Sequence, residues 1–465
     1  MKKINRIHFI GIGGIGMSGI AEVMQNQGYD VSGSDQSSND NVKQLREIGC
    51  DISIGHDEKN IKDADVVVVS SAINDQNPEI RAAKDKGVPI VPRAEMLSEL
   101  MRFKNGIAVS GTHGKTTTTS MIAHMLDCAN LSPTYVIGGR LRKNDKNAHL
   151  GDGEYFVVEA DESDGSFLYF HPTISIVTNI DHDHLGVYEN RFDNLVAAFK
   201  RFISDVPFYG CSVLCVEDET IRQLLPEIHR RVYTYGYDES ATLSCGDIRQ
   251  GNSGIEFSIK SEQFEINTIL KLGVFGDYNA LNALACICVG LELGIEKDVI
   301  FSSLQSFSGI SRRFNIYTIN LDEKRKITVI DDYGHHPTEM ASVISSLRNL
   351  YPDRRIVFVF EPHRYSRVSA LFDDFVETLS LADYRLILPV YPAGEEMISG
   401  ASTADLCAAL RDMGVNNTHG VHEVSSLFRV LDGMLENNDV LLMMGAGSAG
   451  SIAADFLSEY SGGAG

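Results

Sequence analysis

The segment Gly111–Thr119, with the sequence GTHGKTTTT, constrains this chain more than any other. It follows a short apolar run, Ile107–Val109, and precedes a segment, Thr116–Ala129, whose pattern predicts a helix. A strand, a glycine turn and then Gly-Lys-Thr at the start of a helix is the layout of a phosphate-binding loop, in which backbone N–H groups and the helix N-terminus face the phosphates. A glycine turn with a chance lysine is disfavoured because strand and helix signals flank it.

The loop is shorter than the usual form of the motif. The usual pattern has a glycine five residues before the Gly-Lys pair, and here that position is Val109. The first glycine is therefore Gly111, which predicts ATP chemistry in an unusual branch of the P-loop proteins. The lysine would neutralise the outer phosphates, and a threonine hydroxyl would hold Mg²⁺. The residues expected to bind the nucleotide here are Gly111, Thr112, His113, Gly114, Lys115, Thr116 and Thr117.

Length and composition limit the class of protein. A chain of 465 residues is too long for one core, so three domains are expected. A hydrophobic content of 43% with 22% charged residues is typical of a soluble globular protein, and no apolar run approaches the roughly 20 residues of a membrane span. The N-terminal MKKINRIHFIGIGG predicts a first strand rather than a signal peptide.

Charge and cysteine usage point to a cytoplasmic protein with small-molecule ligands. The net charge of −22 argues against non-specific binding of nucleic acid. The eight cysteines are scattered without zinc or disulfide spacing, which fits a reducing cytoplasm. If the ligands are phosphates, the few cations must be concentrated locally.

A second glycine motif opens the chain. The predicted strand Ile4–Ile10 runs into Gly11, Gly13 and Gly16, which match GxGxxG, and Asp35 follows at the distance of a dinucleotide fingerprint. The signal is weak, because the spacing recurs after the predicted strand Val440–Met444. At least one match must be only a close strand–helix turn; the second set is Gly445, Gly447 and Gly450.

The milder prediction is that the helix Ile15–Gln27 points its N-terminus at a diphosphate. Other strands of this region also end in polar groups, and such carboxyl-end loops line the ligand crevice of an open parallel sheet. A helix cap or turn is the ordinary role of the serines. The candidate binding positions are Gly13, Gly14, Ile15, Gly16, Met17, Ser18, Ser34, Asp35, His56, Ser70, Ser71 and Ala72.

Two strands after the phosphate loop end in acidic or imidazole groups. Tyr155–Val158 leads into Glu159, and Ile174–Val177 leads into a TNIDHDH segment that contains His184. A strand beside a P-loop normally carries a carboxylate for Mg²⁺, so Glu159 is the predicted metal ligand. His184 is predicted to be a ligand as well. A zinc site is disfavoured because no cysteine or spaced partner accompanies the cluster.

Polar and β-branched runs between 242 and 270 predict antiparallel strands inserted before the helix Asp277–Leu291. Asn279 and Asn282 share a face of this helix and can meet a base or ribose, with capping as the ordinary alternative. The segment Gly309–Phe314 marks a boundary where two arginines can reach phosphate.

The third region alternates strands and helices again from Ile327 onward and supplies the cations. The strand Ile327–Ile330 leads into DDYGHHP, and Ile356–Phe360 leads into EPHRYSR. Arg364 and Arg367, three residues apart, can form a fork for a carboxylate or phosphate.

With these motifs assembled, the chain resembles the Mur ligases of peptidoglycan synthesis. The resemblance runs in order over nearly the whole chain, through GIGGIGMSGIA, GTHGKTTTT, EADESDGSF, TNIDHDH, GDYNALNALA, RRF, DDYGHHPTE, EPHRYSR and GAG. It implies a three-domain α/β fold. Residues 1–105 would form a Rossmann-like UDP-sugar domain, residues 106–313 a P-loop ATPase domain with inserted antiparallel strands, and residues 314–465 a Rossmann-like domain that closes on ATP and amino acid.

The resemblance also implies an activity. Within the family the motifs resemble the branch that uses ATP to add L-alanine to the lactyl carboxylate of UDP-N-acetylmuramate, through an acyl phosphate, with release of ADP and phosphate. Mg²⁺ would be the metal, with Mn²⁺ able to substitute. A cytoplasmic monomer or homodimer that acts on small molecules, without nucleic acid or membrane insertion, is expected.

The resemblance also assigns roles to the residues of the matching motifs. The resemblance implies that Lys115 binds phosphate, that Thr116 and Glu159 hold Mg²⁺ and that His184 lies near a second metal. The residues implied around ATP are Asn279, Arg313 and Asp332. Those implied to reach the substrate carboxylate and the amino acid are Tyr333, His335, Arg364 and Arg367, and the implied catalytic set is Lys115, His184, His335, Arg364 and Arg367.

Two departures and three alternatives remain. Tyr278 stands where the family often has histidine, which predicts an altered adenine contact, and Lys200 lies too far from the histidine ligand to be the carbamylated lysine of sister ligases. The alternatives are a ligase that attaches a whole tripeptide to the same sugar nucleotide, a dinucleotide-dependent oxidoreductase and a non-enzymatic nucleotide switch. The oxidoreductase leaves the phosphate loop unused, and the switch leaves the Asp331–Arg367 cluster unused.

Overall fold

The computed structural model describes residues 4–70, 73–102, 104–142, 146–183, 185–251, 253–421 and 423–461. The chain forms two compact units. The first comprises Met1–Ile248, Glu256–Gly273 and Asn279–Ile310, and the second comprises Arg249–Ile255, Val274–Tyr278 and Ser311–Gly465. The first unit contains two sheets and the second contains one, and all three are α/β layers, as the sequence predicts.

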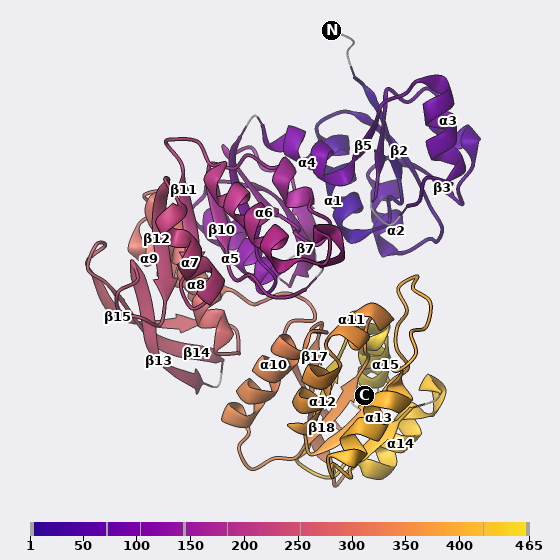
Figure 1. The fold of residues 1–465 in the computed structure, drawn as a ribbon, viewed down its shortest axis with the longest axis vertical. Coiled ribbons are helices and arrows are strands. Elements are labelled where there is room, and N and C mark those ends of the chain that lie inside the picture. Colours follow the sequence, from indigo (N-terminus) through magenta and orange to yellow (C-terminus); the bar gives the residue numbers. More distant parts are fainter. Residues whose placement is uncertain are drawn as a thin grey trace. The chain divides into compact units, whose positions relative to one another are not determined.

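The first sheet is entirely parallel and has the order β3-β2-β1-β4-β5. Its strands are β1 (Arg6–Ile10), β2 (Asp30–Asp35), β3 (Asp51–Ile54), β4 (Val66–Val69) and β5 (Ile90–Pro92). Its helices are α1 (Ile15–Asn26), α2 (Asp40–Glu47), α3 (Pro78–Lys86) and α4 (Arg93–Met101). The strand order reverses at β1, and the loops after β1, β2, β3 and β4 emerge at one edge, where open α/β sheets bind ligands. This sheet is the indigo part of the ribbon in Figure 1.

The second sheet is built around the phosphate-loop strand and has the order β15-β14-β13-β12-β11-β10-β6-β9-β7-β8. Its first strands are β6 (Asn105–Ser110), β7 (Thr134–Leu141), β8 (Lys146–His149), β9 (Tyr155–Glu159), β10 (Ile174–Val177), β11 (Cys211–Cys215) and β12 (Arg231–Gly236). Except for the antiparallel β7–β8 hairpin, these strands pair in parallel. The ends of β6, β9 and β10 therefore lie at the same edge, which brings the three predicted site segments together.

Helices cover this sheet, and the inserted strands extend it. The helices are α5 (Lys115–Cys128), α6 (Phe192–Ser204), α7 (Glu219–Leu224), α8 (Tyr278–Glu292) and α9 (Lys297–Ser306). The insertion supplies β13 (Leu243–Gly251), β14 (Gly254–Ser261) and β15 (Ile266–Leu272). In α8, most residues from Asn279 to Gly290 are buried, so this helix is a central core element rather than an amphipathic surface helix.

The third sheet has the order β16-β17-β21-β18-β19-β20, with only β16 antiparallel to its neighbour. Its strands are β16 (Asn315–Asn320), β17 (Lys326–Asp332), β18 (Ile356–Phe360), β19 (Tyr384–Ile387), β20 (Thr418–Gly420) and β21 (Val440–Met444). Its helices are α10 (Pro337–Leu350), α11 (Tyr365–Ala370), α12 (Phe372–Ser380), α13 (Thr403–Asp412), α14 (Leu427–Met434) and α15 (Ala449–Ser461). Alternate residues of β18 enter different cores: Phe358 packs with α10, α12 and α13, whereas Val357 and Val359 pack with α14 and α15.

The second GxGxxG motif is a close strand–helix turn. The Glu361 carboxylate accepts hydrogen bonds from the Ala449 N–H, at 2.9 Å, and from the Ser448 hydroxyl, at the N-terminus of α15. A Cβ at Gly447 would lie 2.7 Å from this carboxylate. The helix N-terminus that would face a pyrophosphate already has a protein carboxylate on it. Among the described residues, no helix combines the length and apolar character of a membrane span.

A buried arginine on β19 donates hydrogen bonds to backbone carbonyls of two neighbouring segments. Arg385 is only 4% exposed and donates to the carbonyls of Leu379 at 2.7 Å, Ser380 at 3.2 Å and Asn417 at 3.3 Å. Leu379 and Ser380 lie at the end of α12, and Asn417 directly precedes β20, so the guanidinium links these two segments to β19. The carbonyls of Leu379 and Asn417 also accept backbone hydrogen bonds, from the N–H groups of Ala382 at 3.4 Å and Arg385 at 2.9 Å.

We expect Arg385→Met to lower the free energy of unfolding by about 2–4 kcal/mol, because the hydrogen bonds of the buried guanidinium to the carbonyls of Leu379, Ser380 and Asn417 are lost together. Urea unfolding followed by circular dichroism measures this, since the chain has no tryptophan for fluorescence. Arg429→Met, at an exposed position of α14, is the matched control and should change stability by less than about 0.5 kcal/mol. Equal effects of the two variants would contradict the capping role.

Candidate functional site

The phosphate loop joins β6 to α5 through two glycines in the left-handed region. Gly111 has φ +127° and Gly114 has φ +82°, conformations that side chains disfavour. A Cβ at Gly111 would also lie 2.1 Å from Thr178 Oγ1, and one at Gly114 would lie 2.6 Å from Asn282 Oδ1. No side chain caps α5, so its first turn keeps the anion-binding character of a helix N-terminus.

The segment after β10 holds this loop in shape. Asn179 accepts from the N–H of Thr112 through its carbonyl, at 3.1 Å, and from the N–H of His113 through Oδ1, at 2.8 Å. The Thr178 hydroxyl donates to the His113 carbonyl at 2.6 Å, and the Asp181 N–H donates to Thr112 Oγ1 at 2.8 Å. The TNID part of the sequence motif therefore serves as a brace for the phosphate loop.

Lys115 lies folded over the loop. Its Nζ donates to the carbonyls of Gly111 at 2.6 Å and Thr112 at 3.2 Å, and it forms an ion pair with Glu162 at 2.8 Å. Burial alone would lower the pKa of Lys115, but the carboxylates of Glu162, Asp161 and Glu159 outweigh it and raise that pKa. The ammonium is therefore charged and paired with Glu162 in the free chain.

Glu162 is the residue of this centre that sequence reasoning missed. It is 2% exposed, and burial raises the pKa of Glu162 to about 7, with Asp161 adding to the shift and Lys115 opposing it. The EADESD motif pointed to this segment, but strand order alone favoured the carboxylate closest to β9. The carboxylate that contacts the lysine is three residues further on.

The predicted magnesium ligands come together. Thr116 Oγ1 donates to Glu159 Oε1 at 3.1 Å, and the Gly138 N–H donates to Glu159 Oε2 at 2.9 Å. A hydroxyl and a carboxylate side by side next to a phosphate loop are hard oxygen donors that suit Mg²⁺. Thr117 also lies in the first turn of α5. His184 lies outside the described residues.

The glycine loop of the first sheet is held from behind by the β2–α2 connection. The Gly13 N–H donates to Asp35 Oδ2 at 2.9 Å, and Asn39 and Asn41 donate to the Gly13 carbonyl at 3.0 and 2.8 Å. Asp35 thus supports the loop. Gly14 is the N-cap residue of α1, and the helix has neither a side-chain cap nor an acidic residue in its first turn, which leaves a helix end suited to a diphosphate.

Arg93, at the start of α4, is a cation at this glycine loop that the sequence did not indicate. A Cβ at Gly16 would lie 2.5 Å from Arg93 Nη1, so the glycine leaves room for the guanidinium. The arginine also helps to lower the pKa of Asp161, together with Lys115 and two hydrogen bonds from Ser163, against the effect of burial. Its charge therefore acts on the acidic segment after β9.

The other candidate positions of this sheet fall at the predicted edge. Ser34 is buried at the end of β2 and lies 3.0 Å from Nδ1 of His56, which follows β3. Ser70 follows β4, and its N–H donates to the carbonyl of Ile10 at 3.4 Å. Met17 and Ser18 are buried in α1. Ser71 and Ala72 lie outside the described residues.

In the second unit, Asp332 is buried at the end of β17. It is 3% exposed and accepts from the N–H groups of Phe314 and Gly334, both at 2.7 Å. Burial raises the pKa of Asp332, although Arg313 opposes the shift. The Arg313 guanidinium lies 5.1 Å from the centre of the Tyr333 ring, within cation–π range. These three predicted residues therefore form one cluster.

The histidine and arginine motifs form a second cluster in this unit. The rings of His335 and His363 are 5.7 Å apart, and Arg367, which is 6% exposed, donates to the His363 carbonyl at 3.3 Å. Arg364 is exposed and has φ +69°, a strained conformation for a residue with a Cβ. Such strain concentrates at functional sites, which supports the predicted role of this arginine.

Asn279 and Asn282 of α8 have a structural role in the ligand-free chain. Asn282 donates to Asn279 Oδ1 at 2.9 Å and accepts from the Thr118 hydroxyl at 3.2 Å. Both asparagines are buried, at 5% and 6% exposure. They fasten the start of α8 to the phosphate-loop helix, and a contact of Asn279 with a nucleotide remains a prediction. The burial of Tyr278, reinforced by Asp332, raises the pKa of its hydroxyl.

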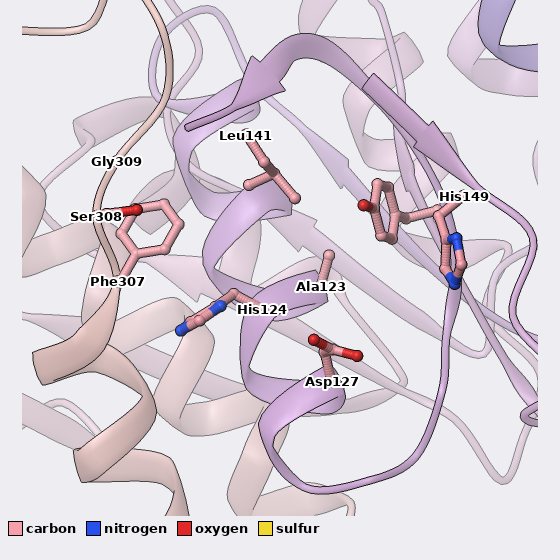
Figure 2. A pocket seen from close by; sticks show the side chains of 9 residues that line it. Ala123, His124, Asp127, Leu141, His149, Phe307, Ser308 and Gly309 are labelled. Carbon is pink, nitrogen blue, oxygen red and sulfur yellow. The ribbon is translucent and has the colours of Figure 1, made fainter. Parts of the chain in front are cut away.

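A separate cavity of about 180 Å³ lies between α5, the β7–β8 hairpin and the segment after α9. Figure 2 shows Asp127 of α5 between the rings of His124 and His149 in that view. Asp127 lies twelve residues after Lys115, or about 18 Å along the helix. The cavity contains none of the predicted site residues.

Three family models match the chain in succession. They are the Mur ligase family catalytic domain at residues 6–105, the Mur ligase middle domain at 109–290 and the Mur ligase glutamate ligase domain at 312–447.

Whole-chain relatives agree with these matches. A UDP-N-acetylmuramate–L-alanine ligase of Methylococcus capsulatus is 49% identical over 453 residues, covering 97% of this chain and 96% of that protein. One of Ruthia magnifica is 45% identical over 446 residues, covering 96% and 95%. The crystal structure of UDP-N-acetylmuramate–alanine ligase MurC from Thermotoga maritima superposes with a TM-score of 0.83 at 31% identity, covering 99% of this chain and 100% of that one.

We expect Glu162→Gln to tighten ADP binding by about tenfold at pH 8, because the ionised carboxylate holds Lys115 and repels phosphate. Since the pKa of Glu162 is about 7, the affinity of the wild-type chain should fall as the pH rises from 6 to 8, and the variant should lack this component. Isothermal titration with ADP at pH 6, 7 and 8 measures how the affinity changes with pH in the wild-type chain and in the variant. Glu189→Gln, the same change at an exposed position, is the control; identical slopes in all three proteins would contradict the account.

Proposed function

This chain belongs to the Mur ligase family, and we propose that it is the ATP-dependent ligase that joins L-alanine to the lactyl carboxylate of UDP-N-acetylmuramate. The observation that carries the proposal is the meeting of Lys115 with Glu162 and of Thr116 with Glu159 at one phosphate loop. The name shared by the full-length relatives supports the substrate assignment.

We propose that three successive ranges of the chain each bind a different substrate. Residues 1–105 would bind the uridine nucleotide at the carboxyl edge of the first sheet, with the glycine loop on the diphosphate. Residues 106–313 would bind ATP, and residues 314–465 would supply the groups for the amino acid. These three ranges are proposed from the sequence motifs.

The first chemical step joins two anions. The lactyl carboxylate attacks the γ-phosphorus of ATP, an O–P bond forms, the bond to the β–γ bridging oxygen breaks, and ADP leaves an acyl phosphate behind. Lys115 would stabilise the charge on the transferring phosphoryl group, as such preorganised cations do in phosphoryl transfer. Mg²⁺, held by Thr116 and Glu159, would neutralise phosphate charge, and Mn²⁺ would serve in its place; His184 is proposed near a second metal.

The second step forms the amide. The amine of L-alanine attacks the acyl carbon, a C–N bond forms, the C–O bond to phosphate breaks, and the nitrogen loses a proton. We assign Arg364 and Arg367 to the carboxylates of the amino acid and the sugar acid, because a guanidinium matches a carboxylate in two-point hydrogen bonding. His335 and Tyr333 would complete this binding surface, and Arg313, Asp332 and Asn279 would bind the nucleotide.

These substrates are small metabolites of the cell interior, so we propose a cytoplasmic enzyme of peptidoglycan precursor synthesis. A monomer or homodimer would suffice, since each predicted site motif occurs in the one chain.

The decisive experiment follows phosphate release from ATP and Mg²⁺ with UDP-N-acetylmuramate and each amino acid in turn. We expect release only when the sugar nucleotide and L-alanine are both present. Release with the L-alanyl tripeptide but not with free L-alanine would replace the proposal with the tripeptide ligase. Release without any amino acid would favour the nucleotide switch.

We expect Arg364→Ala to raise the KM for L-alanine by about tenfold or more and to leave the KM for ATP within about twofold, because one charge-assisted carboxylate contact is lost. Initial-rate kinetics with each substrate varied separately measures both constants. Arg411→Ala, at an exposed position of α13 in the same unit, is the control and should change neither constant. An unchanged alanine KM would remove Arg364 from the amino-acid site.

A further inference from the structure

A buried carboxylate organises the carboxyl edge of the first sheet. Glu79, in the first turn of α3, has an exposure of 0% and accepts from Ser34 Oγ at 2.6 Å, Asn60 Nδ2 at 2.6 Å and the Asp57 N–H at 3.2 Å. His8 Nε2 lies 3.4 Å away. Burial alone would raise the pKa of Glu79, but hydrogen bonds from His8, Ser34 and Asn60 outweigh it and lower that pKa. The carboxylate is therefore ionised at neutral pH.

The positions of the protons follow by counting. An ionised carboxylate has no proton, so the single hydroxyl proton of Ser34 lies in the 2.6 Å contact with Glu79. The Ser34 oxygen can then only accept from His56 Nδ1, which lies 3.0 Å away. Nδ1 of His56 therefore carries the ring proton, and in the neutral ring Nε2 offers a lone pair.

That lone pair has no hydrogen-bond partner. Nε2 of His56 is a buried polar atom without a partner among the described residues, and the side chain is 12% exposed. An unsatisfied buried acceptor is destabilising, and a donor brought by a ligand would remove that cost. Because Nε2 is shielded from solvent in the free chain, a ligand donor reaches it only when the protein atoms that shield it move aside.

We propose that Glu79 is a positioning residue for base recognition: through Ser34 it fixes His56 in the tautomer whose Nε2 accepts a hydrogen bond from the N3–H of uracil. This inference rests on the proposed function, because it requires a uridine nucleotide in the first domain. The N3 atom of uracil is a donor, whereas that of cytosine is an acceptor and would face the lone pair of Nε2. The relay of hydrogen bonds from Glu79 through Ser34 to His56 therefore selects uridine over cytidine nucleotides.

The variant Glu79→Gln should reverse the relay. Two donors, from Asn60 and the Asp57 backbone, face Oε1, so the amide oxygen of Gln is favoured there and its NH₂ group points at Ser34. Ser34 must then donate to His56 Nδ1, and the ring proton moves to Nε2. A donor at Nε2 opposes uracil N3–H and matches cytosine N3.

The test compares UDP with CDP by isothermal titration in the full chain. We expect the wild-type chain to prefer UDP by about tenfold or more, Ser34→Ala to lose most of that preference, and Glu79→Gln to lose it entirely and shift toward CDP. Ser32→Ala is the matched control. It removes a hydroxyl two positions away on β2 that lies 2.9 Å from His8 Nδ1, and it should keep the preference.

A spectroscopic measurement reads the tautomer directly. With ¹⁵N-labelled histidine, long-range ¹H–¹⁵N spectra should show His56 as the Nδ1–H form in the wild-type chain and as the Nε2–H form in Glu79→Gln, with the signal assigned from a His56→Gln spectrum. Thermal melting by circular dichroism checks that each variant is folded. If Glu79→Gln does not fold, the wild-type tautomer and the Ser34→Ala preference decide.

Three outcomes would overturn the inference. These are an Nε2–H tautomer in the wild-type chain, equal affinity of that chain for UDP and CDP, and variants that weaken both nucleotides equally, which would leave Glu79 with a purely structural role. Failure of the proposed function has a different signature, namely no binding of UDP by the wild-type chain and no phosphate release with the sugar nucleotide.

Discussion

The contact between the β10 loop and the phosphate loop is the constraint on which the rest of the first unit depends. Two glycines in left-handed conformations form a turn that has little stability of its own, and the backbone and side chain of Asn179 hold it through hydrogen bonds to Thr112 and His113. With the turn fixed, α5 begins at Lys115, and the lysine and Thr116 reach Glu162 and Glu159. One edge of the sheet thus brings together residues that follow three strands, β6, β9 and β10.

Electrostatics explains why this centre is built from opposing charges. Under the proposed function, a chain with a net charge of −22 binds substrates that are also anions. In the free chain Lys115 is kept charged by three carboxylates, one of which titrates near neutrality because it is buried. A phosphate that displaces Glu162 from the lysine meets a carboxylate that can take up a proton, which lowers the repulsion at the moment of binding.

Local pattern predicted much of this fold. Three strands, β10, β18 and β21, have the bounds read from their apolar runs, because fully buried parallel strands are short, continuous and bounded by turn residues. The meeting of Thr116 with Glu159 was also predictable, since both follow neighbouring parallel strands. The bounds of α5 and α8 moved by only one residue at each end, within the uncertainty of helix termini.

Long-range contacts account for what the sequence could not show. Which carboxylate of EADESD contacts the lysine depends on how the chain turns after β9, and nothing in the spacing specifies that turn. Glu361 lies 88 residues from the Ala449 N–H that it accepts from, so only the structure shows that the last glycine motif is occupied by a carboxylate. Likewise, the grouping of Arg249–Ile255 and Val274–Tyr278 with the second unit cannot be read from chain order.

The central claim is that a substrate carboxylate is activated by direct phosphoryl transfer at the phosphate loop. Isotope transfer tests it most directly: UDP-N-acetylmuramate labelled with ¹⁸O in its lactyl carboxylate is converted with ATP and L-alanine, and the released phosphate is analysed by mass spectrometry or ³¹P NMR. The account predicts one labelled oxygen in each phosphate, because the C–O bond of an acyl phosphate breaks when the amine attacks. Unlabelled phosphate from the same turnover would show that ATP is hydrolysed by water, and it would contradict the account.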